Sequence, residues 1–157
     1  MAEGKKHDIT VTTRTQYIPD QSDESANRYV FAYTITIENT GEAAAQLISR
    51  HWVITDANGK VEEVRGDGVV GEQPLLVPGE TFRYTSGAVL ETPLGTMQGS
   101  YQMVDDDGER FDAVVLASPA AATAELLHSV APDSAAIVRS ITAADVVMVT
   151  LAVPAST

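Results

Sequence analysis

The sequence has no cysteine and few basic residues, and both shortages exclude classes of function. Without cysteine the chain forms no disulfide, no thiolate metal site and no thiol nucleophile. Ten lysines and arginines stand against 22 aspartates and glutamates, which gives a formal net charge of −12. Nucleic-acid affinity comes largely from basic groups that neutralise phosphates. We therefore predict no general nucleic-acid binding.

Long apolar runs are missing as well. The most apolar stretch, VVMVTLAV at 146–153, is far shorter than the ~20 residues of a membrane-spanning helix. The N-terminal residues MAEGKKHDIT contain no apolar signal core. We expect no membrane insertion and, because the lack of cysteine fits a reducing compartment, a cytoplasmic location. A length of 157 residues with 44% hydrophobic residues predicts a globular chain with a sizeable core.

Alternating apolar and polar residues fill most of the chain before residue 116, and this period of two is typical of β-strands. The clearest case is YVFAYTITIEN at 29–39. Further strands are expected at 8–18, 45–56, 60–64, 81–90, 96–104 and 110–117. Turn sequences such as DANG at 56–59 and VPGE at 77–80 separate them. The pattern predicts an all-β antiparallel sandwich or barrel.

The alanine-rich tail after residue 116 has a different pattern. Ser118 is a favourable N-cap and Pro119 suits the first helical position. The expected elements are a helix through 123–130, a second helix at 134–141 and a buried strand at 144–153. We therefore predict a β-sandwich domain over 1–115 and a helical segment with a final strand over 116–157, packed on it.

The stretch VRGDGVVGEQPLLVPGE at 64–80 places Gly66, Gly68 and Gly71 in a G-x-G-x-x-G pattern. In dinucleotide-binding folds this pattern opens a helix whose N-terminus holds a pyrophosphate. Here Pro74 and Pro78 would both break such a helix. The context favours glycines that serve tight β-turns or a bulge.

A weaker alternative stays open for the same loop. Backbone amides can bind an anion without a helix, and Arg65 supplies one positive partner. Asp67 and Glu72 oppose it. A pyrophosphate site at Arg65, Gly66, Gly68 and Gly71 is therefore the alternative hypothesis.

His51 and Trp52 are neighbours in an expected strand, so their side chains point to opposite faces. We expect Trp52 in the core and His51 as a surface contact residue. His7 lies in an N-terminus that we expect to be mobile, and His128 lies in the tail. The three histidines are therefore not spaced as metal ligands.

The acidic run Asp105, Asp106, Asp107 and Glu109 fits an ordinary hairpin tip better than a cation loop. The G-x-S-x-G elbow is absent, and no paired carboxylates stand in a catalytic pattern. We predict a protein without enzymatic activity, cofactor or metal.

Most of the chain resembles the ApaG family. The resemblance rests on RYVFAYTITIENTG (28–41), RHWVITDANGK (50–60), GDGVVGEQPLLVPGE (66–80), YTSGAVLETPLGTMQGSYQMV (84–104) and LAVP (151–154). It implies a sandwich of the immunoglobulin or fibronectin III type. It also implies a module that docks a protein partner or a small ligand, with a link to cobalt and magnesium resistance. The family is further associated with nucleotide or pyrophosphate-type ligands at the glycine loop.

The tail departs from that family. FDAVVLASPAAATAELLHSVAPDSAAIVRSI, from residue 111, resembles a segment of flavin-dependent protoporphyrinogen oxidases. It contains no dinucleotide fingerprint or recognisable flavin ligand, so a chimeric tail is inferred rather than flavin chemistry. Such a tail could have abolished the ancestral role. It also leaves open whether LAVPAST or 146–153 supplies the last strand, and an unpaired edge there would favour a homodimer.

Overall fold

The structure is a computed structural model that describes residues 4–119 and 146–154, with side chains for 4–115. The alternating segments form nine strands. They are β1 (Ile9–Tyr17), β2 (Tyr29–Asn39), β3 (Ala45–Asp56), β4 (Val61–Asp67), β5 (Leu75–Leu76), β6 (Thr81–Leu90), β7 (Gly95–Asp105), β8 (Arg110–Pro119) and β9 (Val146–Pro154). Two short 3₁₀ turns, Pro19–Gln21 and Glu24–Ala26, separate β1 from β2.

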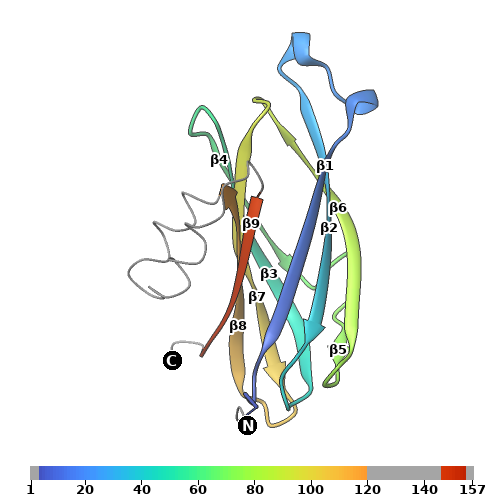
Figure 1. Ribbon diagram of the computed structural model, residues 1–157, viewed down its shortest axis with the longest axis vertical. Helices are drawn as coiled ribbons and strands as arrows, with labels where there is room; N and C mark the ends of the chain where they lie inside the picture. Colours follow the sequence, from blue (N-terminus) through green and yellow to red (C-terminus); the bar gives the residue numbers. More distant parts are fainter. Residues whose placement is uncertain (1–3, 120–145, 155–157) are drawn as a thin grey trace.

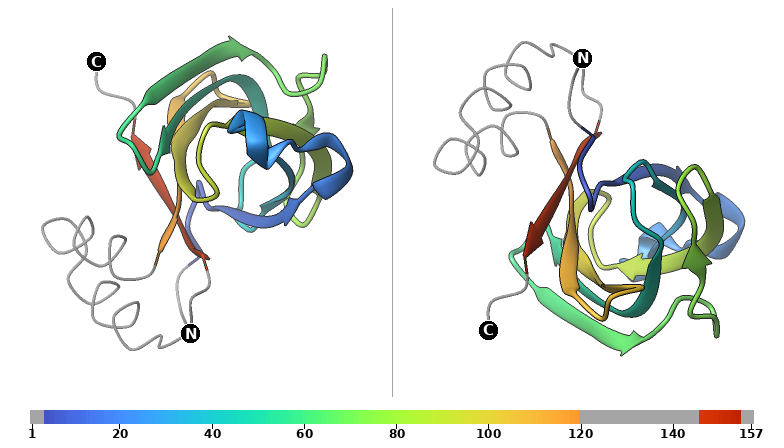
Figure 2. Two further views of the ribbon diagram at one scale, coloured as in Figure 1. Left: turned by 90° about the horizontal axis from the view of Figure 1, so that it is seen from above. Right: turned by 90° about the horizontal axis from the view of Figure 1, so that it is seen from below.

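The strands form two antiparallel sheets that enclose a common interior (Figures 1 and 2). One sheet has the order β1-β2-β6, and the other has the order β4-β3-β7-β8-β9 with β5 paired to the start of β3. The predicted all-β antiparallel sandwich is therefore confirmed. Among the described residues, no helix has the length and apolar character needed to cross a membrane.

Side chains from both sheets fill the interior. The largest fully buried ones are Trp52, Tyr101, Phe111, Ile35, Ile37 and Leu47. Trp52 is 1% exposed, as predicted, and meets Tyr101 edge to face with ring centroids 5.4 Å apart. The hydroxyl groups of Tyr101 and Tyr84 hydrogen-bond across the sheets. Burial raises the pKa of Tyr84 to about 12, although its bond to Tyr101 opposes that shift.

A β-bulge in β3 sets which side chains face inward. The register with β7 shifts between Leu47 and Ser49, so two residues of β3 oppose one on its partner. Beyond the bulge, Trp52 and Ile54 are buried. Because side chains alternate along a strand, Arg50 shares their inner face and His51 lies on the outer face.

The last strand lies at the edge of the larger sheet. β9 pairs antiparallel with β8, so that LAVP at 151–154 lies opposite Phe111–Val114. The predicted helix start at Ser118 is wrong. Ser118 pairs with Val147 and Pro119 with Val146, because the β8–β9 ladder continues through both residues. The helices expected at 123–130 and 134–141 lie outside the described residues.

Candidate functional site

A polar depression lies on the outer face of the larger sheet, where β4, β3 and β7 are adjacent. We call it the outer hollow. It has a volume of about 610 Å³ and is lined by Ser49, Arg50, His51, Arg65, Gly66, Asp67 and Gln102. Register explains why these residues meet, because His51 is opposite Arg65 on β4 and Ser49 is opposite Gln102 on β7.

Hydrogen bonds organise the β7 side of the outer hollow. Ser49 donates from Oγ to Gln102 Oε1 at 2.9 Å, and Gln102 Nε2 donates to Ser100 Oγ at 2.8 Å. On the other side, His51 Nε2 is buried and makes no hydrogen bond within the described chain. Glu63 Oε1 lies 3.5 Å from that nitrogen and forms an ion pair when the imidazole is protonated. The lining of the hollow therefore contains two arginines, Arg50 and Arg65, and one carboxylate, that of Asp67.

The glycine pattern consists of a strand residue followed by a tight turn. Gly66 belongs to β4, opposite Arg50. Gly68 has φ +60°, and a β-carbon there would overlap the carbonyl group of Glu72. Gly71 has φ +83° in a two-residue turn between Val69 and Glu72, whose amide and carbonyl groups bond reciprocally at 2.8 and 2.9 Å. No helix follows within 72–80, where β5 is the regular element. The predicted turn function of Gly68 and Gly71 is confirmed.

The amides of this loop have limited capacity for an anion. Gly68 donates its N–H to Ile48 O at 2.8 Å, and the Val69 and Glu72 amides donate to each other's carbonyl groups. These three donors are therefore already used within the protein. A phosphate at this place would depend on the side chains of Arg65 and His51 more than on a backbone nest.

Arg50 connects the glycine loop to the inside of the sandwich. Its Nη1 donates to Gly68 O at 2.6 Å and to Asp67 O at 3.2 Å. A β-carbon on Gly66 would lie 3.1 to 3.2 Å from three atoms of the guanidinium. Gly66 thus allows the close approach of Arg50. Arg50 was not among the residues predicted for a site, although its position two residues before Trp52 on a strand places it on the same face.

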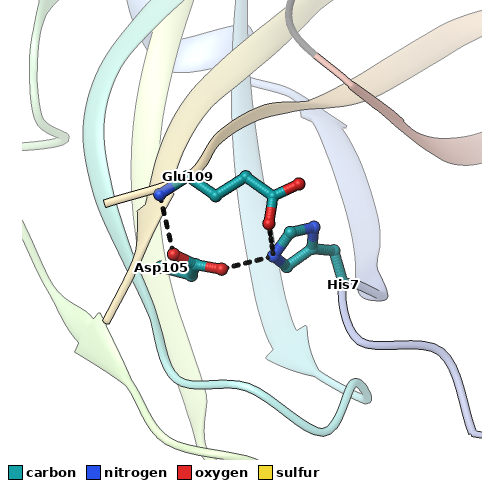
Figure 3. Close-up of side chains that lie close together, drawn as sticks. All are labelled: His7, Asp105 and Glu109. Atoms are coloured by element: carbon teal, nitrogen blue, oxygen red, sulfur yellow. Dashed lines mark hydrogen bonds and ion pairs between the residues drawn. The ribbon is translucent and has the colours of Figure 1, made fainter. Parts of the chain in front are cut away.

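A second polar cluster joins the N-terminal segment to the β7–β8 turn (Figure 3). His7 Nε2 donates to Asp105 Oδ2 at 2.8 Å, and its ring stacks on Phe111 with centroids 4.2 Å apart. Lys6 Nζ lies 2.9 Å from Asp105 and 2.7 Å from Glu109. The expectation that His7 lies in a mobile N-terminus is therefore wrong. These contacts hold His7 against Asp105, which lies 98 residues later in the sequence.

Asp105 is the centre of this cluster, which we call the N-terminal clasp. Its Oδ1 accepts the amides of Asp107 and Glu109 at 2.9 and 2.8 Å, and thereby shapes the hairpin tip. The hydrogen bond from His7, followed by that from Lys6, holds the pKa of Asp105 well below its usual range. The same carboxylates raise the pKa of Lys6. Asp105 is 5% exposed, which a sequence pattern of three consecutive aspartates does not reveal.

Donor atoms of His7, Asp105 and Glu109 lie within 4.8 Å of one another, as a metal site requires. However, the ammonium of Lys6 already lies between the two carboxylates. A metal ion would have to displace it. The geometry therefore favours a structural role for the clasp.

Comparison with known proteins identifies the fold and its relatives. Residues 19–105 match the ApaG domain. A protein ApaG from Thiobacillus denitrificans is 70% identical over 115 residues, which cover 73% of this chain and 91% of that protein. The chain belongs to the ApaG family. A second relative, from Nitrosospira multiformis, is 65% identical over the same share of both chains.

A crystal structure of the family agrees with the described fold. The ApaA protein from Bordetella pertussis is 56% identical, superposes with a TM-score of 0.70, and covers 71% of this chain and 91% of its own. The names of these ApaG relatives indicate no catalytic function. The expectation of a protein without enzymatic activity is consistent with this family.

Proposed function

We propose that this ApaG-family protein is a non-enzymatic binding module that docks a protein partner or a small ligand. The outer hollow carries the proposal, because it gathers charged groups of both signs around a concave surface. A nucleophilic serine is commonly activated by a histidine base. Within residues 4–115, neither His7 nor His51 makes a hydrogen bond to a serine hydroxyl.

A second candidate function is binding of a phosphate-containing small molecule, such as a nucleotide or pyrophosphate. One observation favours it: Arg65 and Gly66 line the same hollow as His51, which belongs to a different strand. In this proposal Arg65 contacts the phosphate, and His51 lines the same hollow. Gly68 and Gly71 contribute by shaping the turn that follows.

Isothermal titration with pyrophosphate and with ATP tests this proposal. We expect saturable binding, and we expect Arg65→Ala to lower the affinity at least tenfold. Arg83→Ala, an exposed arginine on the opposite sheet, is the matched control and should bind as the wild type does. Equal losses in both variants, or no heat with either ligand, would reject the phosphate-binding function.

The finer implications of the family resemblance belong to the same proposal. They are a sandwich of the immunoglobulin or fibronectin III type, a cytoplasmic location, and an indirect role in cobalt and magnesium resistance through a bound partner. Growth of a deletion strain on cobalt, with and without the Arg65→Ala protein, tests whether resistance depends on the hollow. Unchanged cobalt sensitivity after deletion would reject that link.

The tail beyond residue 115 carries two further proposals. We propose that it forms a separate segment, similar to part of a protoporphyrinogen oxidase, and that the chain forms a homodimer through an edge strand. β9 ends the order of the larger sheet and presents such an edge. Thermal melting after deletion of 116–150 tests the first proposal: a more stable protein would support an insertion around a complete sandwich, whereas unfolding would show that the deleted parts of β8 and β9 belong to the core. A monomer mass in light scattering at high concentration would reject the dimer.

A further inference from the structure

A second groove, which shares Arg50 but no other lining residue with the outer hollow, opens between the edge strands β4 and β6. It has a volume of about 410 Å³, which lies in the range of small-molecule sites. Its floor is the inner face of β3, with Arg50, Trp52 and Ile54, and Tyr84 and Ser86 of β6 line the opposite side. We call it the inter-sheet groove. The rest of the lining consists of Gly87, the apolar residues Val64, Val70, Ala88 and Val89, the ring of Tyr33, and Glu62, which is opposite Ile54 and places one carboxylate at that end.

Trp52 contributes a hydrogen-bond donor that has no acceptor. Its Nε1 is buried and unpaired within the described chain, and leaving such a group unpaired costs about 1–3 kcal/mol. The opposite edge of the indole, at Cε3, lies against Gly99 of β7, where a β-carbon would come within 2.7 Å. Nε1 and Cε3 are on opposite edges of the ring, so the N–H is directed away from Gly99, and Val64 of β4 is the partner of Trp52 on its other side.

Arg50 contributes a positive charge that has no carboxylate partner among residues 4–115. Both of its hydrogen bonds are made by Nη1 to backbone carbonyl groups. Its Nε and Nη2 have no acceptor in that part of the chain. The guanidinium lies over Gly66, and Val64, the partner of Trp52, comes two residues earlier on the same strand. Two residues with unused hydrogen-bond donors, Arg50 and Trp52, therefore line the same groove.

We propose that the inter-sheet groove binds a small organic anion with a flat apolar body, of the arylalkyl carboxylate class. The carboxylate lies between Arg50 and Trp52 and accepts hydrogen bonds from the guanidinium and from the indole N–H. The apolar body packs along the groove toward Ile54 and Ala88. Because the indole N–H is covered in the free protein, binding moves the side chain that covers it. This proposal does not depend on phosphate binding at the outer hollow.

The single tryptophan makes the test direct, because the indole N–H of Trp52 gives one cross-peak in a ¹H–¹⁵N correlation spectrum. The probes are 3-phenylpropionate, its neutral amide and inorganic phosphate. We expect the carboxylate to shift the indole peak saturably, the amide to bind at least tenfold more weakly, and phosphate to leave the peak in place. An indole peak that no probe moves, or that carboxylate and amide move equally, would overturn the proposal.

Two variants test the location. Arg50→Gln keeps a donor for the loop carbonyl groups but removes the charge, and we expect at least a tenfold loss of 3-phenylpropionate affinity. Ser86→Leu, which fills the groove from β6, should abolish the shift without touching the loop. Arg65→Ala, outside the groove, is the control and should bind normally. Wild-type affinity in Ser86→Leu would overturn the site, whereas a phosphate response at Arg65 without an indole response would support only the outer hollow.

Discussion

The guanidinium of Arg50 lies against the backbone of Gly66, so close that a β-carbon on Gly66 would come 3.1 Å from Nη1. The two residues are cross-strand partners in the β3–β4 ladder. The first glycine of the G-x-G-x-x-G pattern therefore makes room for an arginine of the same protein. A motif that resembles a nucleotide fingerprint is here explained by packing.

The other two glycines of the pattern predict a graded loss of stability. Gly68→Ala should lower the free energy of unfolding by about 2 kcal/mol or more, because φ is positive and the new β-carbon overlaps Glu72. Gly71→Ala should cost about 1 kcal/mol, since its φ is positive but the space around it is open. Urea denaturation measures both. A larger loss for Gly71→Ala than for Gly68→Ala would contradict the described turn.

Val70 offers a stabilising substitution. It is an exposed, β-branched residue with φ +45°, a conformation that such side chains rarely adopt. The two-residue turn it shares with Gly71 favours asparagine at this position. Val70→Asn should raise the free energy of unfolding by about 1 kcal/mol, measured by urea denaturation. A lower stability would show that the Val70 side chain contributes more through contacts than it costs in strain.

Gly99 of β7 and Gly87 of β6 form a matched pair of strand glycines, one in each sheet. A β-carbon on Gly99 would overlap the carbonyl group of His51 and press on the Trp52 ring, whereas one on Gly87 would only approach Phe31 O at 3.3 Å. Gly99→Ala should cost about 3 kcal/mol and shift the tryptophan emission. Gly87→Ala should stay within about 1 kcal/mol of the wild type. Similar effects of both changes would contradict the packing of Trp52 on β7.

The N-terminal clasp predicts a dependence of stability on pH. A carboxyl group whose pKa is lower in the folded chain stabilises the fold above its unfolded pKa of about 3.9, and this contribution disappears as the pH falls through the folded pKa. Asp105 is such a group. Asp105→Asn should therefore lower the melting temperature at pH 7 by several degrees, and the difference from wild type should shrink below about pH 4.

Asp107→Asn is the control for the clasp. Its carboxylate is exposed and lies 3.4 Å from Lys6, and such exposed pairs contribute little. Melting temperatures across pH 3–7 should be nearly those of the wild type. A loss as large as that of Asp105→Asn would assign the effect to general charge rather than to the buried carboxylate.

Local pattern predicts most of the fold and only part of the site. The strand bounds at 29–39, 45–56 and 81–90 match the structure because one face of each strand is buried and the other is not. The end of β8 could not be predicted, because Ser118 and Pro119 suit a helix start locally and only pairing with β9 makes them a strand. Tertiary pairing overrides local preference there.

Contacts between distant segments account for the rest. The His7–Asp105 bond joins residues 98 apart, and nothing in either segment alone indicates the other. Similarly, the role of Arg50 depends on the register that places Gly66 opposite it. In contrast, Arg65 and His51 could be proposed as contact residues from the sequence. The sequence did not indicate that they line the same hollow.

The most direct test of the proposed binding function is a titration of the ¹⁵N-labelled protein with ATP while ³¹P NMR follows the nucleotide. We expect saturable shifts of backbone amides around Arg65 and His51, weakened in Arg65→Ala, with the ATP intact over hours. Steady hydrolysis abolished by Arg65→Ala would contradict a non-enzymatic module. The absence of any shift around the outer hollow would contradict the assignment of that surface as the phosphate site.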